Sequence, residues 1–124
     1  MANNKISFDT VRKMGMALPG VEEGTAYGSP ALKVRGKLLA CIPIHRSAEP
    51  DSLAVRIAFE DRAALMAAAP DVYYLTEHYV EHPVVLARLS RIRSDALRDL
   101  LAMGWRFVTA KGGVPVARRK RRES

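Results

Sequence analysis

The chain has 124 residues, of which 48% are hydrophobic and 27% charged, and its formal net charge is +7. These proportions are typical of one globular domain and exclude general disorder, and the length leaves no room for two sizeable cores. No run approaches the ~18 apolar residues that span a membrane, and the N-terminus lacks the apolar stretch of a signal peptide. We therefore expect a cytoplasmic protein with no membrane partner.

The N-terminal segment has the pattern of a helix. Apolar side chains recur at helical spacing from Phe8 to Leu18. Ser7 precedes them as a good N-cap residue, and Pro19-Gly20 ends the run. The spacing predicts a helix over residues 7–18.

The next stretch reads as turns followed by a hairpin. Residues 24–30 are rich in turn formers around one aromatic residue, Tyr27. Residues 31–34 and 38–42 have short apolar strand patterns. The connection Arg35-Gly36-Lys37 can be tight, because glycine adopts a positive φ without steric cost. We expect these two strands to pair antiparallel.

The rest of the chain alternates between strands and helices. Acidic residues at the start of residues 60–69 and a serine at the start of residues 94–108 favour helices there. Strand patterns cover residues 53–59, 72–75 and 84–89. Grouped strands with helices at both ends predict an α+β fold, in which helices from the N-terminus and the C-terminus pack against an antiparallel sheet.

The positive charge is concentrated at the C-terminal end. Residues 118–122 carry five positive charges and Glu123 removes one, so this end supplies four of the net seven. We expect a single domain over residues 1–111 and a disordered basic tail over residues 112–124. The tail could contact nucleic acid, or it could only raise solubility.

The string His78-Tyr79-Val80-Glu81-His82 matches the H-x-x-E-H arrangement of inverted zinc peptidases. That chemistry needs a helix, because only helical spacing brings two histidines four apart toward one metal. Pro83 disfavours helical geometry at His82. The only downstream glutamate that could act as a third ligand lies in the tail. We therefore expect no metal and no cofactor here.

The sequence also lacks the pattern of nucleophilic catalysis. Cys41, the single cysteine, lies in an apolar run and is expected to be a buried, inert thiol. It could pair with His45, but no acid that would orient the histidine is identifiable. Three early glycines spaced four apart do not fit a phosphate-binding loop. We expect no catalytic residue and no enzymatic activity. An enzyme is only the third alternative, behind two kinds of binding protein.

Basic residues surround the tip of the predicted hairpin. Lys33, Arg35 and Lys37 alternate along and around it, so they could point to one face. Arg88 lies on the last strand. Such cations can neutralise phosphates of a nucleic acid and release counterions. The alternative is that they only keep the faces and edges of the sheet in solution.

Two sets of motifs resemble one known family. The segments Leu18-Pro19-Gly20, Tyr27-Gly28-Ser29-Pro30-Ala31 and Val34-Arg35-Gly36-Lys37 are similar to the N-terminal half of the MmcQ/YjbR-like proteins. Thr76-x-His78-Tyr79, Pro83-x-Val85-Leu86-x-Arg88-Leu89 and the closing helix to Trp105 are similar to the C-terminal half. The resemblance covers residues 7–110 and excludes the tail. His82 departs from the pattern, which has an aromatic residue before the proline.

The resemblance implies a frataxin/CyaY-like arrangement, sometimes described as a double-wing DNA-binding fold. Members are usually called DNA-binding by structural analogy, and the family has no established reaction. Carried over by position, the candidate nucleic-acid-binding residues are Lys33, Arg35, Lys37 and Arg88. Iron binding would need an acidic ridge on the first helix, where Asp9 is the only acid. We therefore reject iron binding.

Two functional hypotheses follow. The first is a monomeric accessory or regulatory protein that binds DNA and has no catalytic activity. The alternative is a small-molecule or protein-interaction domain, in which Tyr27, His78 and Tyr79 line a cleft. A concave pocket around these three side chains would favour the alternative over DNA binding.

Overall fold

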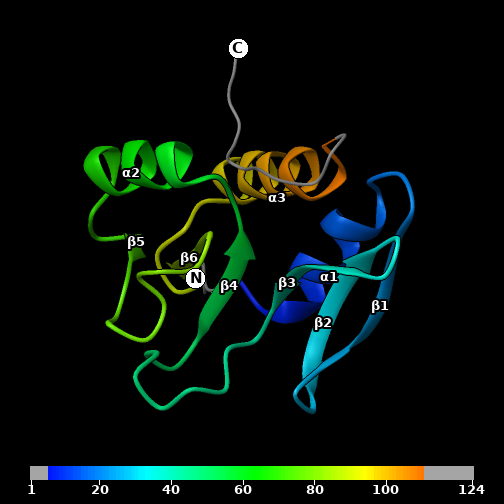
Figure 1. The fold of residues 1–124 in the computed structure, drawn as a ribbon, viewed down its shortest axis with the longest axis horizontal. Helices are drawn as coiled ribbons and strands as arrows, with labels where there is room; N and C mark the ends of the chain where they lie inside the picture. Colours follow the sequence, from blue (N-terminus) through cyan, green and yellow to red (C-terminus); the bar gives the residue numbers. More distant parts are fainter. Residues whose placement is uncertain (1–5, 111–124) are drawn as a thin grey trace, which may run out of the picture.

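The computed structural model describes residues 6–110, so the predicted basic tail lies outside the described residues. Within that range, three helices accompany one six-stranded sheet (Figure 1). In chain order the elements are α1 (Phe8–Met16), β1 (Val21–Ala26), β2 (Ser29–Val34), β3 (Lys37–Cys41), β4 (Ser52–Arg56), α2 (Phe59–Ala68), β5 (Tyr73–Tyr74), β6 (Val84–Arg88) and α3 (Ser94–Thr109).

The strands lie in the order β1-β2-β3-β4-β6-β5, and each neighbouring pair is antiparallel. The first three form a meander. The pairing between β3 and β4 is short, because only Ala40 with Val55 and Cys41 with Ala54 are in register. The sheet is therefore two three-stranded halves joined by a narrow seam.

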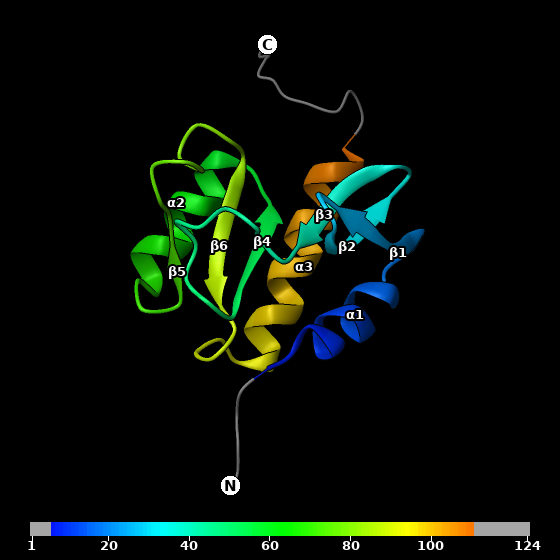
Figure 2. The ribbon, with the colours of Figure 1, turned by 90° about the horizontal axis from the view of Figure 1, so that it is seen from below.

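The helices pack on one face of the sheet, as Figure 2 shows with β4 and β6 in front of α2 and α3. The main core lies between them and includes Leu32, Leu39 and Leu53 from the strands. Helix α3 crosses the seam, and Gly104 allows its close approach. A Cβ added at Gly104 would lie 2.8 Å from the carbonyl oxygen of Arg56. The glycine that weakens this helix in isolation is therefore required by packing.

The predicted α+β fold with an antiparallel sheet and terminal helices is confirmed. The predicted hairpin is formed by β2 and β3, with Arg35 and Gly36 both at positive φ in the turn. Strand β1 was not predicted. It is an edge strand that buries only Val21, so its sequence carries no apolar alternation for a pattern to detect.

Several predicted boundaries were wrong. The predicted helix 7–18 is shorter, and Ser7 makes no side-chain capping bond. The predicted strand 53–59 ends at Arg56, and Phe59 already begins α2. Ser94 is the first residue of α3 rather than its cap, because the extended residue before the helix is Arg93. End residues depend on local dihedrals, which apolar periodicity does not report.

In residues 6–110, every helix is too short or too polar to cross a membrane.

A candidate ligand cleft on the open face of the sheet

The face of the sheet opposite the helices carries a second, smaller apolar cluster. Its buried members are Ala31, Cys41, Ala54 and Leu86, from four adjacent strands. Most of these side chains are small, so they leave space above the sheet. Two loops cover the cluster in part: the loop after β3 crosses in front of β6 in Figure 2, and the segment between β5 and β6 lies beside it.

These loops and the sheet enclose a cleft of about 910 Å³. Ligand pockets of proteins commonly measure about 300–1,000 Å³, so the cleft can hold one small molecule. Its apolar lining includes Leu38, Cys41, Ala54 and Val84 from the strands. The predicted cleft residues Tyr27, His78 and Tyr79 all line it. The structure therefore brings together the three side chains named from the sequence.

Tyr27 stands at the rim of the cleft. It lies in the turn between β1 and β2, at a φ of 55° with Gly28 at 81°, as the tight turn of a hairpin requires. Its side chain is 83% exposed. A large, exposed aromatic residue at a strained backbone position is not explained by packing, and a ligand could cover it.

A cluster of rings forms the wall of the cleft. The imidazoles of His45 and His78 stack with their centroids 3.7 Å apart and their planes at 12°. The ring of Tyr79 stands edge-on to both, at 4.7 Å from His78 and 6.3 Å from His45. A hydrogen bond of 2.7 Å between the hydroxyl oxygens of Ser47 and Thr76 ties the two loops together. This stack was not predicted, because the sequence suggested only Cys41 as a possible partner of His45.

Hydrogen bonds to Ser47 orient the His45 ring of the stack. The backbone N–H of Ser47 donates to Nδ1 of His45 at 3.1 Å. The same Nδ1 lies 2.7 Å from the hydroxyl oxygen of Ser47, so both contacts fix the orientation of the ring. Desolvation, with the nearby His45 and His82 rings, lowers the pKa of His78 below its ordinary value. The lowered pKa favours the neutral form of His78.

The thiol and the phenol of the cleft are not activated. Cys41 is 7% exposed, as predicted, and burial raises the pKa of its thiol. Burial is also the main cause that raises the pKa of Tyr79. Both groups are therefore protonated at neutral pH, which is the opposite of what a nucleophile or a general base needs.

The H-x-x-E-H string lies in turns, not in a helix. The backbone N–H of Tyr79 donates to the carbonyl of Thr76, and that of His82 donates to the carbonyl of Tyr79. The rings of His78 and His82 are 6.3 Å apart and tilted. Within the described part of the chain, no group of three or more histidine, cysteine or acidic side chains is arranged to hold a metal ion.

The predicted nucleic-acid-binding residues do not form one surface. Lys33 lies opposite Leu38, and Lys37 lies opposite Val34. Because Val34 faces the helices, Lys37 is on the helix side of the hairpin and Lys33 is on the open side. The expectation that the three cations share one face was wrong. A spacing of two residues keeps one face only along a straight strand, and the turn at Arg35 breaks it.

Arg88 is engaged within the protein. Its Nε and Nη2 donate to the two carboxylate oxygens of Glu49 at 2.8 and 2.9 Å. Its guanidinium lies 4.3 Å from the centroid of the Tyr74 ring. The hydroxyl of Tyr74 in turn accepts the N–H of Glu49 at 2.7 Å. Arg88 thus anchors the loop after β3, and its charge is neutralised there.

Two arginines that were not proposed for the cleft also line it. Arg46 lies beside His45 in the loop after β3, and Arg56 lies at the end of β4. Aspartate and glutamate are absent from the lining that the described residues provide. The sequence offered no signal for this, because the lining comes from the turn after β1, strands β3, β4 and β6, and two loops.

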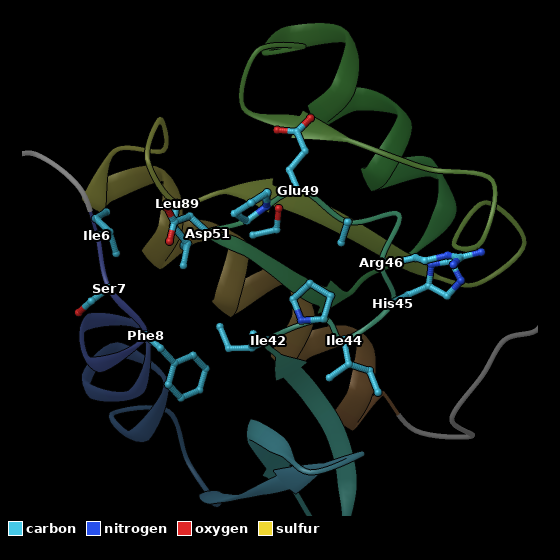
Figure 3. Close-up of a pocket in the computed structure, with 14 residues that line it drawn as sticks. Ile6, Ser7, Phe8, Ile42, Ile44, His45, Arg46, Glu49, Asp51 and Leu89 are labelled. Carbon is cyan, nitrogen blue, oxygen red and sulfur yellow. The ribbon is translucent and has the colours of Figure 1, made fainter.

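A second hollow of about 680 Å³ lies on the other side of the same loop, against the start of the described chain. Figure 3 shows Phe8 and Ile42 close together in it. The side chains of His45 and Arg46 point away from its centre (Figure 3). Both residues line the cleft as well as the edge of this hollow.

The architecture defines an α+β domain with helices on one face of the sheet and a cleft on the other. A family model described as YjbR matches residues 16–107, which is well over half of the chain. The chain belongs to the YjbR family, as its motifs indicated.

The chain is also similar to several known proteins. A crystal structure of Deinococcus radiodurans protein DR2400, described by the family-model domain DUF419, is similar with a TM-score of 0.70 and 21% identity, over 90% of this chain and 83% of that one. This similarity supports the fold alone. The uncharacterized proteins Rv2570 of Mycobacterium tuberculosis and Mb2600 of Mycobacterium bovis are each 38% identical over 56 residues, or 44% of this chain. The match spans 43% of the length of each relative.

Proposed function

We propose that this chain is a cytoplasmic binding protein without catalytic activity, which holds one small, partly apolar molecule in the cleft on the open face. The observation that carries the proposal is the convergence of Tyr27, His78 and Tyr79 on one concave, apolar-floored space. Apolar pockets with a few polar groups at their walls are the usual form of small-molecule sites.

Binding rather than catalysis is supported by the state of the reactive groups. The thiol of Cys41 and the phenol of Tyr79 have raised pKa values, and no aspartate or glutamate of residues 6–110 lines the cleft beside the histidine stack. These groups can pack against a ligand and hydrogen-bond to it, and none is prepared to take a proton from it.

Cys41 offers a direct test, because it is the single cysteine and lines the cleft. N-ethylmaleimide should alkylate it slowly in the free protein. We expect 2-naphthamide, a flat neutral probe, to slow the reaction further by covering the thiol. An alkylation rate that 2-naphthamide leaves unchanged up to its solubility limit would contradict the proposal.

The matched variants are Tyr27→Asn and Val80→Ala. Asparagine tolerates the positive φ of Tyr27 and removes its ring, so protection by 2-naphthamide should weaken. Val80 is also an exposed apolar residue, near His78 in the chain, but it does not line the cleft. Its variant should keep full protection.

DNA binding by the β2–β3 hairpin is the second candidate. Arg35 and Lys37 are exposed at its tip, and neither has a recorded ion pair in the described part of the chain. Fluorescence anisotropy with duplex DNA should then show binding that weakens steeply between about 50 mM and about 200 mM salt. The double variant Arg35→Ala, Lys37→Ala should lose affinity. Binding unaffected by these substitutions would exclude the hairpin as the contact.

A further inference from the structure

We propose that the cleft selects a flat, apolar anion, in the simplest case an aromatic carboxylate. This inference rests on the proposed function, since it names the class of ligand for the same site. Three features carry it: the sign of the charge around the cleft, the condition of two arginines, and the rings at the wall and the rim.

The charged side chains that line the cleft are all basic. Arg46 and Arg56 contribute guanidinium groups, and acidic side chains are absent from the lining formed by residues 6–110. Glu77 and Glu81 lie in the same segment as His78 but do not line the cleft. A hollow with low-dielectric walls and charge of one sign attracts ligands of the opposite sign.

Three other arginines of the described chain have carboxylate partners. Arg12 pairs with Asp9 and Glu23, Arg88 with Glu49, and Arg93 with Asp95. Among residues 6–110, the two cleft arginines, Arg46 and Arg56, have no ion pair with a carboxylate, and the same is true of the exposed Arg35. Arginine is the side chain best suited to recognise a carboxylate, because its planar fork can donate two parallel hydrogen bonds.

Arg56 has a buried hydrogen-bond donor that is not satisfied among the described residues. Its Nε is buried and has no hydrogen-bond partner within the described structure. Its guanidinium carbon lies 5.8 Å from the centroid of the Phe107 ring, which does not satisfy an N–H donor. A buried donor without an acceptor costs free energy. Arg56 lines the cleft and also a smaller hollow beside Phe107, and an anion in the cleft toward which the side chain turned would supply the missing acceptor.

The rings explain why the anion should be flat and apolar. The stack of His45 and His78, with Tyr79 edge-on, forms a wall of aromatic surface. Tyr27 presents a mostly exposed ring at the opening. Flat rings gain from stacking and edge contacts with such walls. Arg46 and Arg56 line the same cleft, so positive charge lies beside this aromatic surface.

Three probes that share one ring system separate charge from shape: 2-naphthoate, 2-naphthamide and 2-naphthylmethylammonium. Calorimetric titration of the full chain at neutral pH and low salt should rank the carboxylate first, about tenfold tighter than the amide, and the ammonium last. Equal or tighter binding of the amide would overturn the anion preference and leave the proposed function standing. Failure of all three to bind would overturn both.

Single arginine variants test which side chains cause the preference for an anion. Arg56→Gln and Arg46→Gln should each weaken 2-naphthoate several-fold and leave 2-naphthamide unchanged. Arg35→Gln removes the same charge at the hairpin tip, outside the cleft, and should change neither. Arg56→Lys keeps the charge and should retain part of the affinity, which separates recognition from a loss of folding. Equal losses for both probes in Arg56→Gln and Arg46→Gln would overturn the assignment of these arginines.

Discussion

The ion pair between Glu49 and Arg88 holds one of the loops that border the cleft. Arg88 grips both carboxylate oxygens of Glu49 across 39 positions of sequence, and it packs on Tyr74. The contact holds the loop after β3 over the open face. Arg88 belongs to one of the family motifs. The motif alone does not show that the partner of Arg88 is Glu49.

The pair makes stability depend on pH. Arg88 lowers the pKa of Glu49 from its ordinary value of 4.5, mainly through the side-chain hydrogen bond. A carboxyl group with a depressed folded-state pKa contributes stability above its unfolded value, and that contribution is lost as the pH falls through the folded value. Between about pH 5 and about pH 3, the melting temperature of Glu49→Gln should therefore fall less than that of the wild type.

Asp9 and Asp95 also have lowered pKa values, so the variant should keep part of the acid sensitivity. Asp95→Asn serves as a comparison, because its ion pair with Arg93 is exposed and involves no residue of the loop. Identical acid profiles for Glu49→Gln and the wild type, followed by circular dichroism, would show that the pair contributes nothing to stability.

At the scale of elements, hydrogen bonds attach the loop after β3 to the sheet. The hydroxyl of Tyr74, in β5, lies 2.6 Å from the hydroxyl of Ser52 and accepts the N–H of Glu49. Ser52 is 2% exposed, so its hydroxyl has little access to water. The loop thus closes one side of the cleft with ordered hydrogen bonds.

Removing that hydroxyl should loosen the loop. Tyr74→Phe should lower the free energy of unfolding by about 1–3 kcal/mol, because Ser52 and the N–H of Glu49 lose a partner. Urea denaturation measures the change. The control is Tyr27→Phe, whose side chain is 83% exposed and should leave the free energy of unfolding unaffected. Equal stability of the two variants would mean that water replaces the hydroxyl of Tyr74.

Local signals predicted the elements that depend on local chemistry. The hairpin of β2 and β3 follows from two apolar runs and one glycine turn, and α3 follows from its apolar stripe. Strand β1 escaped detection because an edge strand buries almost nothing. The facing of Lys33 and Lys37 was misjudged because the turn reverses the chain between them.

At the scale of the whole molecule, the cleft is a product of the topology. His45 and His78 meet because two loops, on either side of the β4–α2–β5 segment, fold onto the same face of the sheet. The sequence could suggest that Tyr27, His78 and Tyr79 share a cleft only as a hypothesis. It held no sign of Arg46 and Arg56 beside them, since these residues come from separate segments. Because the helices cover one face of the sheet, the cleft forms on the opposite face.

The central claim is that this open face is the binding surface of the protein. The most direct measurement is a ¹H–¹⁵N correlation spectrum of the full chain during titration with 2-naphthoate. We predict shifts that concentrate on Cys41, Ala54 and His78, with Arg35 and Lys37 at the hairpin tip unchanged. Shifts confined to the hairpin tip, or no localised shifts at saturating probe, would contradict the account.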